Sequence, residues 1–180
     1  MRLEQSNVIK LLISDVEDLD VIAVYIEDLG PCRGKITITC FNDCWSYFWG
    51  AMGKGLDIST FFRMASDSYL AGKLQPRLND TEIDLDQLEH AAKKRIIEQR
   101  RAGDIAGSEA RELYDISGYL SEIVSEDPTG SSDFMYRIFG DEWWYSAPQK
   151  PNHEYVRLCR IIRTIKEALE KQTIQENPVR

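Results

Sequence analysis

The chain lacks several features that would place it in a functional class directly. It has no apolar run near the ~20 residues needed to cross a bilayer. Its N-terminus has neither the apolar core nor the small-residue cleavage site of a signal peptide. Internal repeats and low-complexity blocks are also absent from the sequence. These absences predict a cytoplasmic protein with no membrane association.

Cysteine and histidine are scarce, with four and two copies among 180 residues. Without an export signal, the cysteines are expected to be free thiols in a reducing compartment. A structural zinc site normally uses two closely spaced ligand pairs. The chain offers one irregular pair, Cys40 and Cys44. We therefore favour buried apolar cysteines and predict no metal and no other cofactor.

The catalytic motifs that the sequence approaches are incomplete. His153-Glu154 begins like a zinc-protease motif, but Arg157 stands where the second histidine is required. The glycine-rich stretch 50–55 has Phe48 at the first glycine position of a phosphate loop and Gly55 where serine or threonine should follow the lysine. No cysteine has a histidine in a context that marks a catalytic base. We assign no catalytic residue and favour a protein that is not an enzyme.

Positive charge is also in short supply, with 22 basic against 30 acidic residues and a net charge of −8. A field of this sign opposes binding to a nucleic-acid backbone and favours a basic protein surface. Acidity also keeps proteins soluble, which is the simpler interpretation. Nucleic acid is therefore a disfavoured partner.

What the sequence does contain predicts an α+β fold, with a three-stranded antiparallel sheet covered by aromatic helices and a mainly helical second half. Segments 7–14, 21–27 and 35–41 are rich in β-branched residues and are expected as strands. Asn42 or Asp43 is expected to cap a helix, because four large residues follow at helical spacing: Trp45, Phe48, Trp49 and Met52. The next helix is expected to begin after Asp57 or Ser59, with one face formed by Ile58, Phe61, Phe62, Ala65 and Tyr69.

The second half of the chain predicts helices over about 84–102 and 108–124, and a last helix after Asn152. Residues 126–133 have the composition of a linker. The expected parts, within one compact domain, are the sheet with two helices at 1–75, a helical hairpin at 76–126, and an aromatic loop with the C-terminal helix at 133–180.

The most unusual local feature is an acidic and aromatic run: Asp141, Glu142, Trp143, Trp144 and Tyr145. Adjacent tryptophans cannot point the same way on a regular element, so one of them is expected at the surface. Aromatic side chains rimmed by acids are typical of a protein-binding hot spot. We predict that this run binds a partner protein. The alternative is that both tryptophans cover the core.

Two other charge clusters support competing hypotheses. Carboxylates around a divalent metal would indicate a nucleic-acid-processing enzyme, and the candidates are Asp15, Glu17, Asp18, Asp20, Glu82, Asp84, Asp86 and Glu89. A basic stripe would indicate a small nucleic-acid-binding regulator, and it comprises Lys93, Lys94, Arg95, Arg100 and Arg101. Both sets are more simply solvated faces, since the acids lie at turns or a helix start and the stripe is interleaved with acids.

Residues 35–74 resemble a small protein family of tailed phages and prophages of enteric bacteria. The likeness rests on the strand Ile36–Cys40, the stretch Trp45–Gly53 and the stretch Tyr69–Leu74. It implies a viral accessory protein expressed in a bacterial cytoplasm, and it transfers no functional residue. The leading hypothesis is therefore a non-enzymatic phage protein that binds and inhibits or redirects a host protein, such as a component of antiviral defence. Homo-oligomerisation is compatible with this role.

Overall fold

Strands and helices both occur in the chain, which confirms the predicted α+β class. The structure is a computed structural model. It describes residues 3, 5, 7–126 and 133–176, except the side chains of 174–176. Residues 127–132 of the expected linker lie outside the described residues.

Contacts along the chain divide it into two units, which we treat separately. The sheet unit comprises residues 1–80 and 153–180, and the helical unit comprises residues 81–152. The segment 133–180, which we expected to form one part of the protein, therefore contributes to both units. In sequence terms the helical unit is an insertion into the sheet unit.

The sheet unit contains a four-stranded antiparallel sheet in the order β1-β2-β3-β4. Its strands are β1 (Ile9–Ile13), β2 (Ile22–Asp28), β3 (Gly34–Cys40) and β4 (Asp43–Trp49). The first three confirm the predicted strands. As predicted, Ile36, Ile38 and Cys40 share the buried face of β3, and the threonines between them are half-buried on the other face.

The fourth strand corrects the sequence prediction, which placed a helix over Trp45–Met52. The chain instead turns back after β3 through Phe41 and Asn42, so that Cys40 pairs with Asp43. Phe41 has a left-handed backbone with φ of 55°, as two-residue hairpin turns often require at their first position. β4 then alternates: its inward residues are Trp45, Tyr47 and Trp49, which pair with Ile38, Ile36 and Gly34. Aromatic residues at spacing i, i+2, i+4 suit a strand next to an apolar neighbour.

The two helices that follow β4 are short and separately capped. α1 (Ile58–Met64) starts at Asp57, whose side chain accepts a hydrogen bond from the Thr60 backbone N–H at 2.7 Å. α2 (Asp67–Leu74) starts at Ser66, whose hydroxyl accepts from the Tyr69 N–H at 3.3 Å. Satisfied N-terminal donors stabilise short helices. The predicted single helix is thus broken at Ala65-Ser66.

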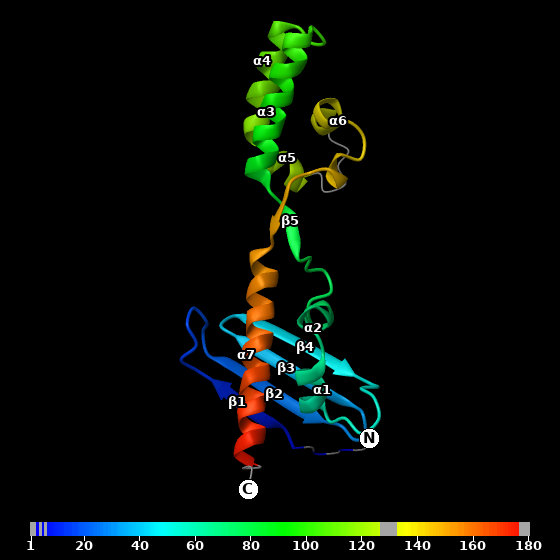
Figure 1. The fold of residues 1–180 in the computed structure, drawn as a ribbon, viewed down its shortest axis with the longest axis vertical. Coiled ribbons are helices and arrows are strands. Elements are labelled where there is room, and N and C mark those ends of the chain that lie inside the picture. Colours follow the sequence, from blue (N-terminus) through cyan, green and yellow to red (C-terminus); the bar gives the residue numbers. More distant parts are fainter. Residues whose placement is uncertain (1–2, 4, 6, 127–132, 177–180) are drawn as a thin grey trace. The chain divides into compact units, whose positions relative to one another are not determined.

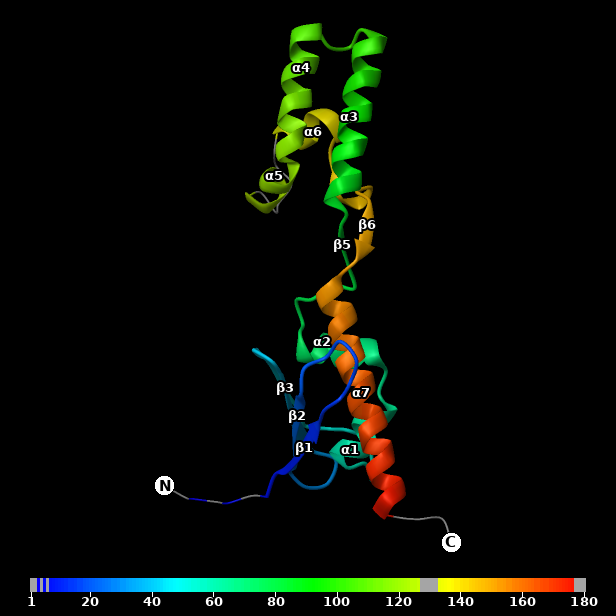
Figure 2. The same ribbon diagram turned by 90° about the vertical axis from the view of Figure 1, so that its left-hand side faces the viewer.

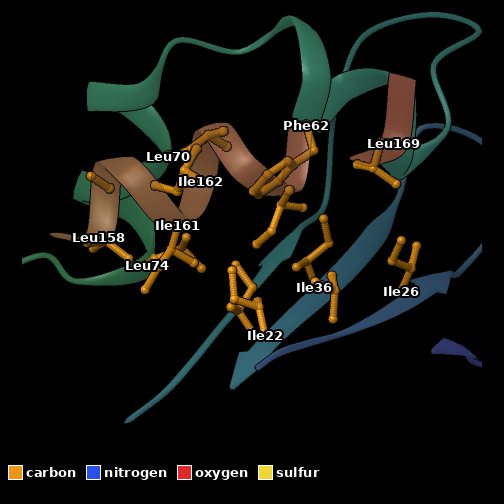
Figure 3. Close-up of a cluster of buried hydrophobic side chains, with 14 of the residues drawn as sticks. Ile22, Ile26, Ile36, Phe62, Leu70, Leu74, Leu158, Ile161, Ile162 and Leu169 are labelled. Atoms are coloured by element: carbon orange, nitrogen blue, oxygen red, sulfur yellow. The ribbon is translucent and has the colours of Figure 1, made fainter. Parts of the chain in front are cut away.

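The long helix α7 (His153–Glu176) completes the covering layer of the sheet unit. Figure 2 shows α1, α2 and α7 on the same side of the sheet, and Figure 1 shows α7 crossing the strands. Figure 3 shows Ile22, Ile26 and Ile36 of the strands directed toward side chains of the three helices. The helical side of this core is fully or almost fully buried and includes Phe62, Leu70, Leu158, Ile161, Ile162 and Leu169.

Basic residues at every third position fix α7 to the loops around the sheet. Arg157 contacts Asp43 in the β3–β4 hairpin at 2.6 Å. Arg160 donates to the Glu17 carbonyl in the β1–β2 connection at 2.5 Å. Arg163 and Lys166 both contact Asp67 at the start of α2, at 2.7 and 2.6 Å. The same helix therefore provides an apolar face to the sheet and cations to three separate connections.

The helical unit is built mainly from α3 (Leu85–Ala102), α4 (Gly107–Ile116), α5 (Leu120–Glu126) and α6 (Asp133–Phe139). Of two short 3-10 helices, η1 (Ser117–Tyr119) lies between α4 and α5, and η2 (Trp143–Tyr145) follows α6. The strands β5 (Thr81–Ile83) and β6 (Gln149–Pro151) pair antiparallel and bring its two ends together. The helix predicted over 84–102 is confirmed: Asp84 caps it, and Gly103 ends it at a φ of 87°.

This unit has its own core, formed by side chains from α3 to η2. The helix predicted over 108–124 is interrupted by η1, where the buried Ser117 hydroxyl donates to the Tyr114 carbonyl at 2.6 Å. The buried apolar residues include Leu88, Ala92, Ile96, Leu113, Leu120, Met135, Ile138 and Trp143. A separate core allows the unit to be stabilised by its own contacts.

Gly34 gives the first test of this packing. A Cβ at residue 34 would lie 2.5 Å from the Ile58 Cβ and 3.1 Å from the Glu27 carbonyl oxygen. We expect Gly34→Ala to lower the free energy of unfolding by about 1–3 kcal/mol through overpacking. Gly72→Ala is the matched control, because nothing lies within 4 Å of that position in α2. It should instead raise stability by about 0.5–1 kcal/mol. Denaturant unfolding measures both, and equal effects would contradict the proposed packing of Gly34 against α1.

Asp67 gives a pH-dependent test of how α7 docks. Burial raises the pKa of its carboxyl, but hydrogen bonds from Lys166 and Arg163 outweigh burial, so the pKa lies below its usual value of 3.8. The ionised group therefore stabilises the fold above that value, and the contribution is lost as the pH falls through the lowered pKa. We expect Asp67→Asn to reduce the free energy of unfolding at neutral pH by about 1–3 kcal/mol. The difference from the parent protein should shrink in acid, and a difference that stays constant with pH would contradict this assignment.

Candidate functional site

The predicted acidic and aromatic run lies in the helical unit, between α6 and β6. Its three aromatic residues form η2. Trp143 is 4% exposed and belongs to the core, whereas Trp144 is 38% and Tyr145 is 80% exposed. The expectation that one tryptophan reaches the surface is confirmed. The candidate site is therefore Trp144 and Tyr145 with the exposed acids Asp141 and Glu142, and its role in binding stays a prediction.

Backbone geometry explains why the neighbouring rings separate. Gly140 and Glu142 both have left-handed backbones, with φ of 86° and 57°. The Asp141 carboxylate accepts a hydrogen bond from the Glu142 N–H at 2.9 Å, the local contact that lets acidic residues stabilise turns. The Tyr145 N–H then donates to the Glu142 carbonyl at 3.0 Å. This tight turn directs successive side chains to different sides.

The three aromatic rings form a continuous row from the core to the surface. The rings of Trp143 and Trp144 pack edge to face with centroids 6.2 Å apart, and those of Trp144 and Tyr145 are tilted with centroids 5.9 Å apart. Such contacts add stabilisation beyond that of burial alone. The buried Trp143 therefore restrains the exposed Trp144, which lowers the entropy lost when a partner covers it.

Charge is distributed unequally between the units. The helical unit has 15 acidic and 8 basic residues, and the sheet unit has 15 acidic and 14 basic residues. The helical unit therefore carries −7 of the total charge of −8. The candidate site therefore belongs to a unit with a strong net negative charge, which attracts basic partners and speeds their association.

The carboxylates proposed for a metal site are divided between the two units. Residues 15–20 belong to the sheet unit and residues 82–89 to the helical unit. Several have structural partners: Asp84 caps α3, Glu89 contacts Lys93, and Glu82 contacts Lys150. Within residues 7–126 and 133–176, no group of three or more acidic, cysteine or histidine side chains is placed to hold a metal. In those residues the carboxylates do not form the assembled metal centre that the hypothesis of a metal-dependent nucleic-acid-processing enzyme requires.

The cysteines are free thiols, as expected, but the expectation that they are buried is wrong for two of them: Cys40 and Cys159 are buried, whereas Cys32 is half-buried and Cys44 is exposed. Cys40 and Cys44 do not flank a helix start, because both lie in the β3–β4 hairpin and face opposite sides of the sheet. Burial raises the pKa of the Cys40 thiol, although the nearby Arg157 opposes this. A thiol with a raised pKa is a poor nucleophile at neutral pH, in keeping with a structural role for Cys40.

The basic stripe is partly neutralised, and it has an aromatic neighbour that the sequence did not indicate. Lys93 contacts Glu89 at 2.5 Å, and Arg95 donates to the Ile138 and Phe139 carbonyls at 3.3 Å. Tyr114 of α4 lies beside the stripe, with the Lys93 Nζ 5.3 Å from its ring centroid. It lines a groove of about 390 Å³ between α3 and α4, together with Ile96, Ile97, Arg100, Arg101, Ala110 and Arg111. Only the helical hairpin brings these residues together.

Comparison with known proteins relates the chain to phages. A family model described as a phage family, Phage_phiTE_072, matches residues 1–171. The match spans both units and extends well beyond residues 35–74. Neither the curated proteins nor the solved structures compared with the chain give a match. In the described part of the chain, no helix combines the length and apolarity needed to span a membrane.

The different burial of the two tryptophans predicts different mutational effects. Trp143→Ala should lower the free energy of unfolding of the helical unit by about 3–5 kcal/mol, because it leaves a cavity in the core. Trp144→Ala should change it by less than about 1.5 kcal/mol, because its ring is partly exposed and does not belong to the buried core. Denaturant unfolding followed by circular dichroism provides the measurement. A larger loss for Trp144→Ala than for Trp143→Ala would show that the assignment of core and surface is reversed.

Proposed function

The chain belongs to this phage family, and from that premise we propose that it is an accessory protein that binds a host protein and inhibits or redirects it. The proposed setting is the cytoplasm of an enteric bacterium, and a component of antiviral defence is one such target. The observation that carries the proposal is the exposure of Trp144 and Tyr145 on the unit that holds nearly all of the net negative charge.

The chemistry of the site specifies the kind of surface it would bind. Trp144 and Tyr145 offer large apolar area with few rotatable bonds, which is typical of residues that dominate interface energy. Asp141 and Glu142 are both exposed, directly precede the aromatic residues in the chain and would meet lysine or arginine side chains. The proposed partner surface is therefore basic with an apolar pocket, as on many proteins that bind nucleic acid. Inhibition would follow from steric occlusion of that surface or from mimicry of nucleic-acid charge.

Capture from a host lysate by the full chain, followed by mass spectrometry, tests the proposal. We expect the parent protein to retain a host protein, and Trp144→Ala/Tyr145→Ala to reduce its retention at least tenfold because the two anchors are lost. The matched control is Tyr119→Ala/Tyr136→Ala, which removes two aromatic rings that are also exposed on the helical unit. Circular dichroism must show that both double variants are folded.

Salt and nucleic acid distinguish the competing interpretations. Binding to a basic surface should weaken as ionic strength rises, and Glu142→Gln should slow association more than it speeds dissociation. Retention that is equal in all variants would contradict the role of the 141–145 run. A salt-sensitive affinity for DNA or RNA that requires Lys94 and Arg101 would favour the nucleic-acid-binding regulator instead.

A further inference from the structure

The strand β1 is a free edge of the sheet in the sheet unit. Among the described residues it pairs on one side only, with β2, in a register that runs from Ile9–Ile26 to Ile13–Ile22. The backbone N–H and C=O groups that point away from β2 can therefore pair with another strand. Adding a strand to such an edge is a recurrent mode of protein recognition.

A groove of about 840 Å³ runs beside this edge, between β1 and the second half of α7. Figure 1 shows the two elements in the sheet unit. The half-buried Leu11 and Ile13 line the groove from the strand, and Ala168 lines it from the helix. The inward side chains of an added strand would enter this space, so the groove supplies room as well as backbone partners.

The two edges of the sheet are protected differently. At β4, the Lys73 Nζ lies 5.5 Å from the Tyr47 ring centroid and the Arg157 guanidinium lies 5.9 Å from that of Trp45. Cations over the inward row of an edge strand discourage further pairing. At β1 the Lys10 Nζ lies 5.4 Å from the Tyr25 ring centroid on the outer face, but on the inward face Ile9 is exposed, and Leu12 is 65% exposed on the outer face. Exposed apolar residues on both faces of an edge strand mark an interaction surface.

We propose that this edge binds the β1 strand of a second copy of the chain, antiparallel, about a two-fold axis at Leu11. The strand sequence Ile9-Lys-Leu-Leu-Ile13 is self-complementary in that register. Leu11 faces Leu11 of the second copy and Ile9 faces its Ile13, so the inward row is apolar throughout. On the outer face Lys10 meets Leu12 of the second copy. A register centred on Lys10 would place two like charges opposite each other, which is unfavourable.

Charges at the two ends of the groove support the same arrangement. Asp15 and Glu17 line it at the C-terminal end of β1. α7 runs antiparallel to β1. Its first half is near the C-terminal end of the strand, where Arg160 contacts Glu17, and its second half is near the N-terminal end, where Gln172 lines a second pocket with Asn7 and Ile9. Lys171 therefore lies toward the N-terminal end of β1. A two-fold rotation directs Lys171 of each copy toward the acidic end of the other, and the sheet unit, with a net charge of only −1, adds little repulsion.

Charge substitutions on the outer face of β1 test the register in the full chain. Sedimentation equilibrium should show a reversible dimer for the parent protein. Leu12→Lys places a lysine opposite Lys10 of the second copy at two symmetric positions, and it should weaken dimerisation about tenfold. Leu12→Glu is the matched control: it makes two opposite-charge pairs and should leave the affinity within about threefold. The double variant Lys10→Glu/Leu12→Lys should recover the affinity lost in Leu12→Lys.

The outcomes separate the proposal from its alternatives. A monomeric parent protein at every accessible concentration would overturn it, and so would a dimer that is indifferent to all three variants. Equal weakening by Leu12→Lys and Leu12→Glu would also overturn it, because that pattern belongs to a different register of the two strands. Because Leu12 is exposed in the single chain, unfolding measured at concentrations where the parent protein is monomeric should show unchanged stability. The result is independent of the role proposed for Trp144 and Tyr145.

Discussion

The packing of α7 across the sheet is the interaction on which the rest of the structure depends. Its apolar face buries Leu158, Ile161 and Ile162 against strands that are more than a hundred residues earlier in the chain. Its cations reach the β1–β2 connection, the β3–β4 hairpin and the start of α2. Hydrophobic burial supplies most of the stabilisation, while the charged contacts select one orientation of the helix, because each of them pairs with a different connection.

This long-range contact determines how the chain is organised. Residues 81–152 leave the sheet unit and return to it before α7 begins, and the β5–β6 pair closes their two ends. The inserted segment has its own buried core, so its surface can vary with little effect on the sheet. The concentration of negative charge in that segment fits the proposal that partner binding resides there. The sheet unit is nearly neutral and offers a strand edge, a surface suited to backbone pairing.

Much of the local structure follows from local patterns in the sequence. The strands β1, β2 and β3 were predicted from β-branched residues, and α3 from its apolar spacing, its Asp84 cap and its terminal glycine. β4 was not predicted, because Trp45 and Trp49 are spaced four residues apart, which fits a helix as well as a strand. Tyr47 between them decides the matter, since only an extended chain places all three rings against Ile36 and Ile38. That apolar surface belongs to a neighbouring strand, and a local pattern does not contain it.

The candidate site shows the same division. The sequence by itself determined that residues 141–145 combine acids with aromatic rings and that the tryptophans must separate. Only the tertiary structure decided that Trp143 is buried in the core while Trp144 is exposed. It also decided that Tyr114 lies beside the basic stripe and that β1 is an edge strand next to a groove. The physical reason is that capping, turn geometry and periodicity act over a few residues. Burial and exposure depend instead on which distant segment covers a side chain, and that is set when the two cores form.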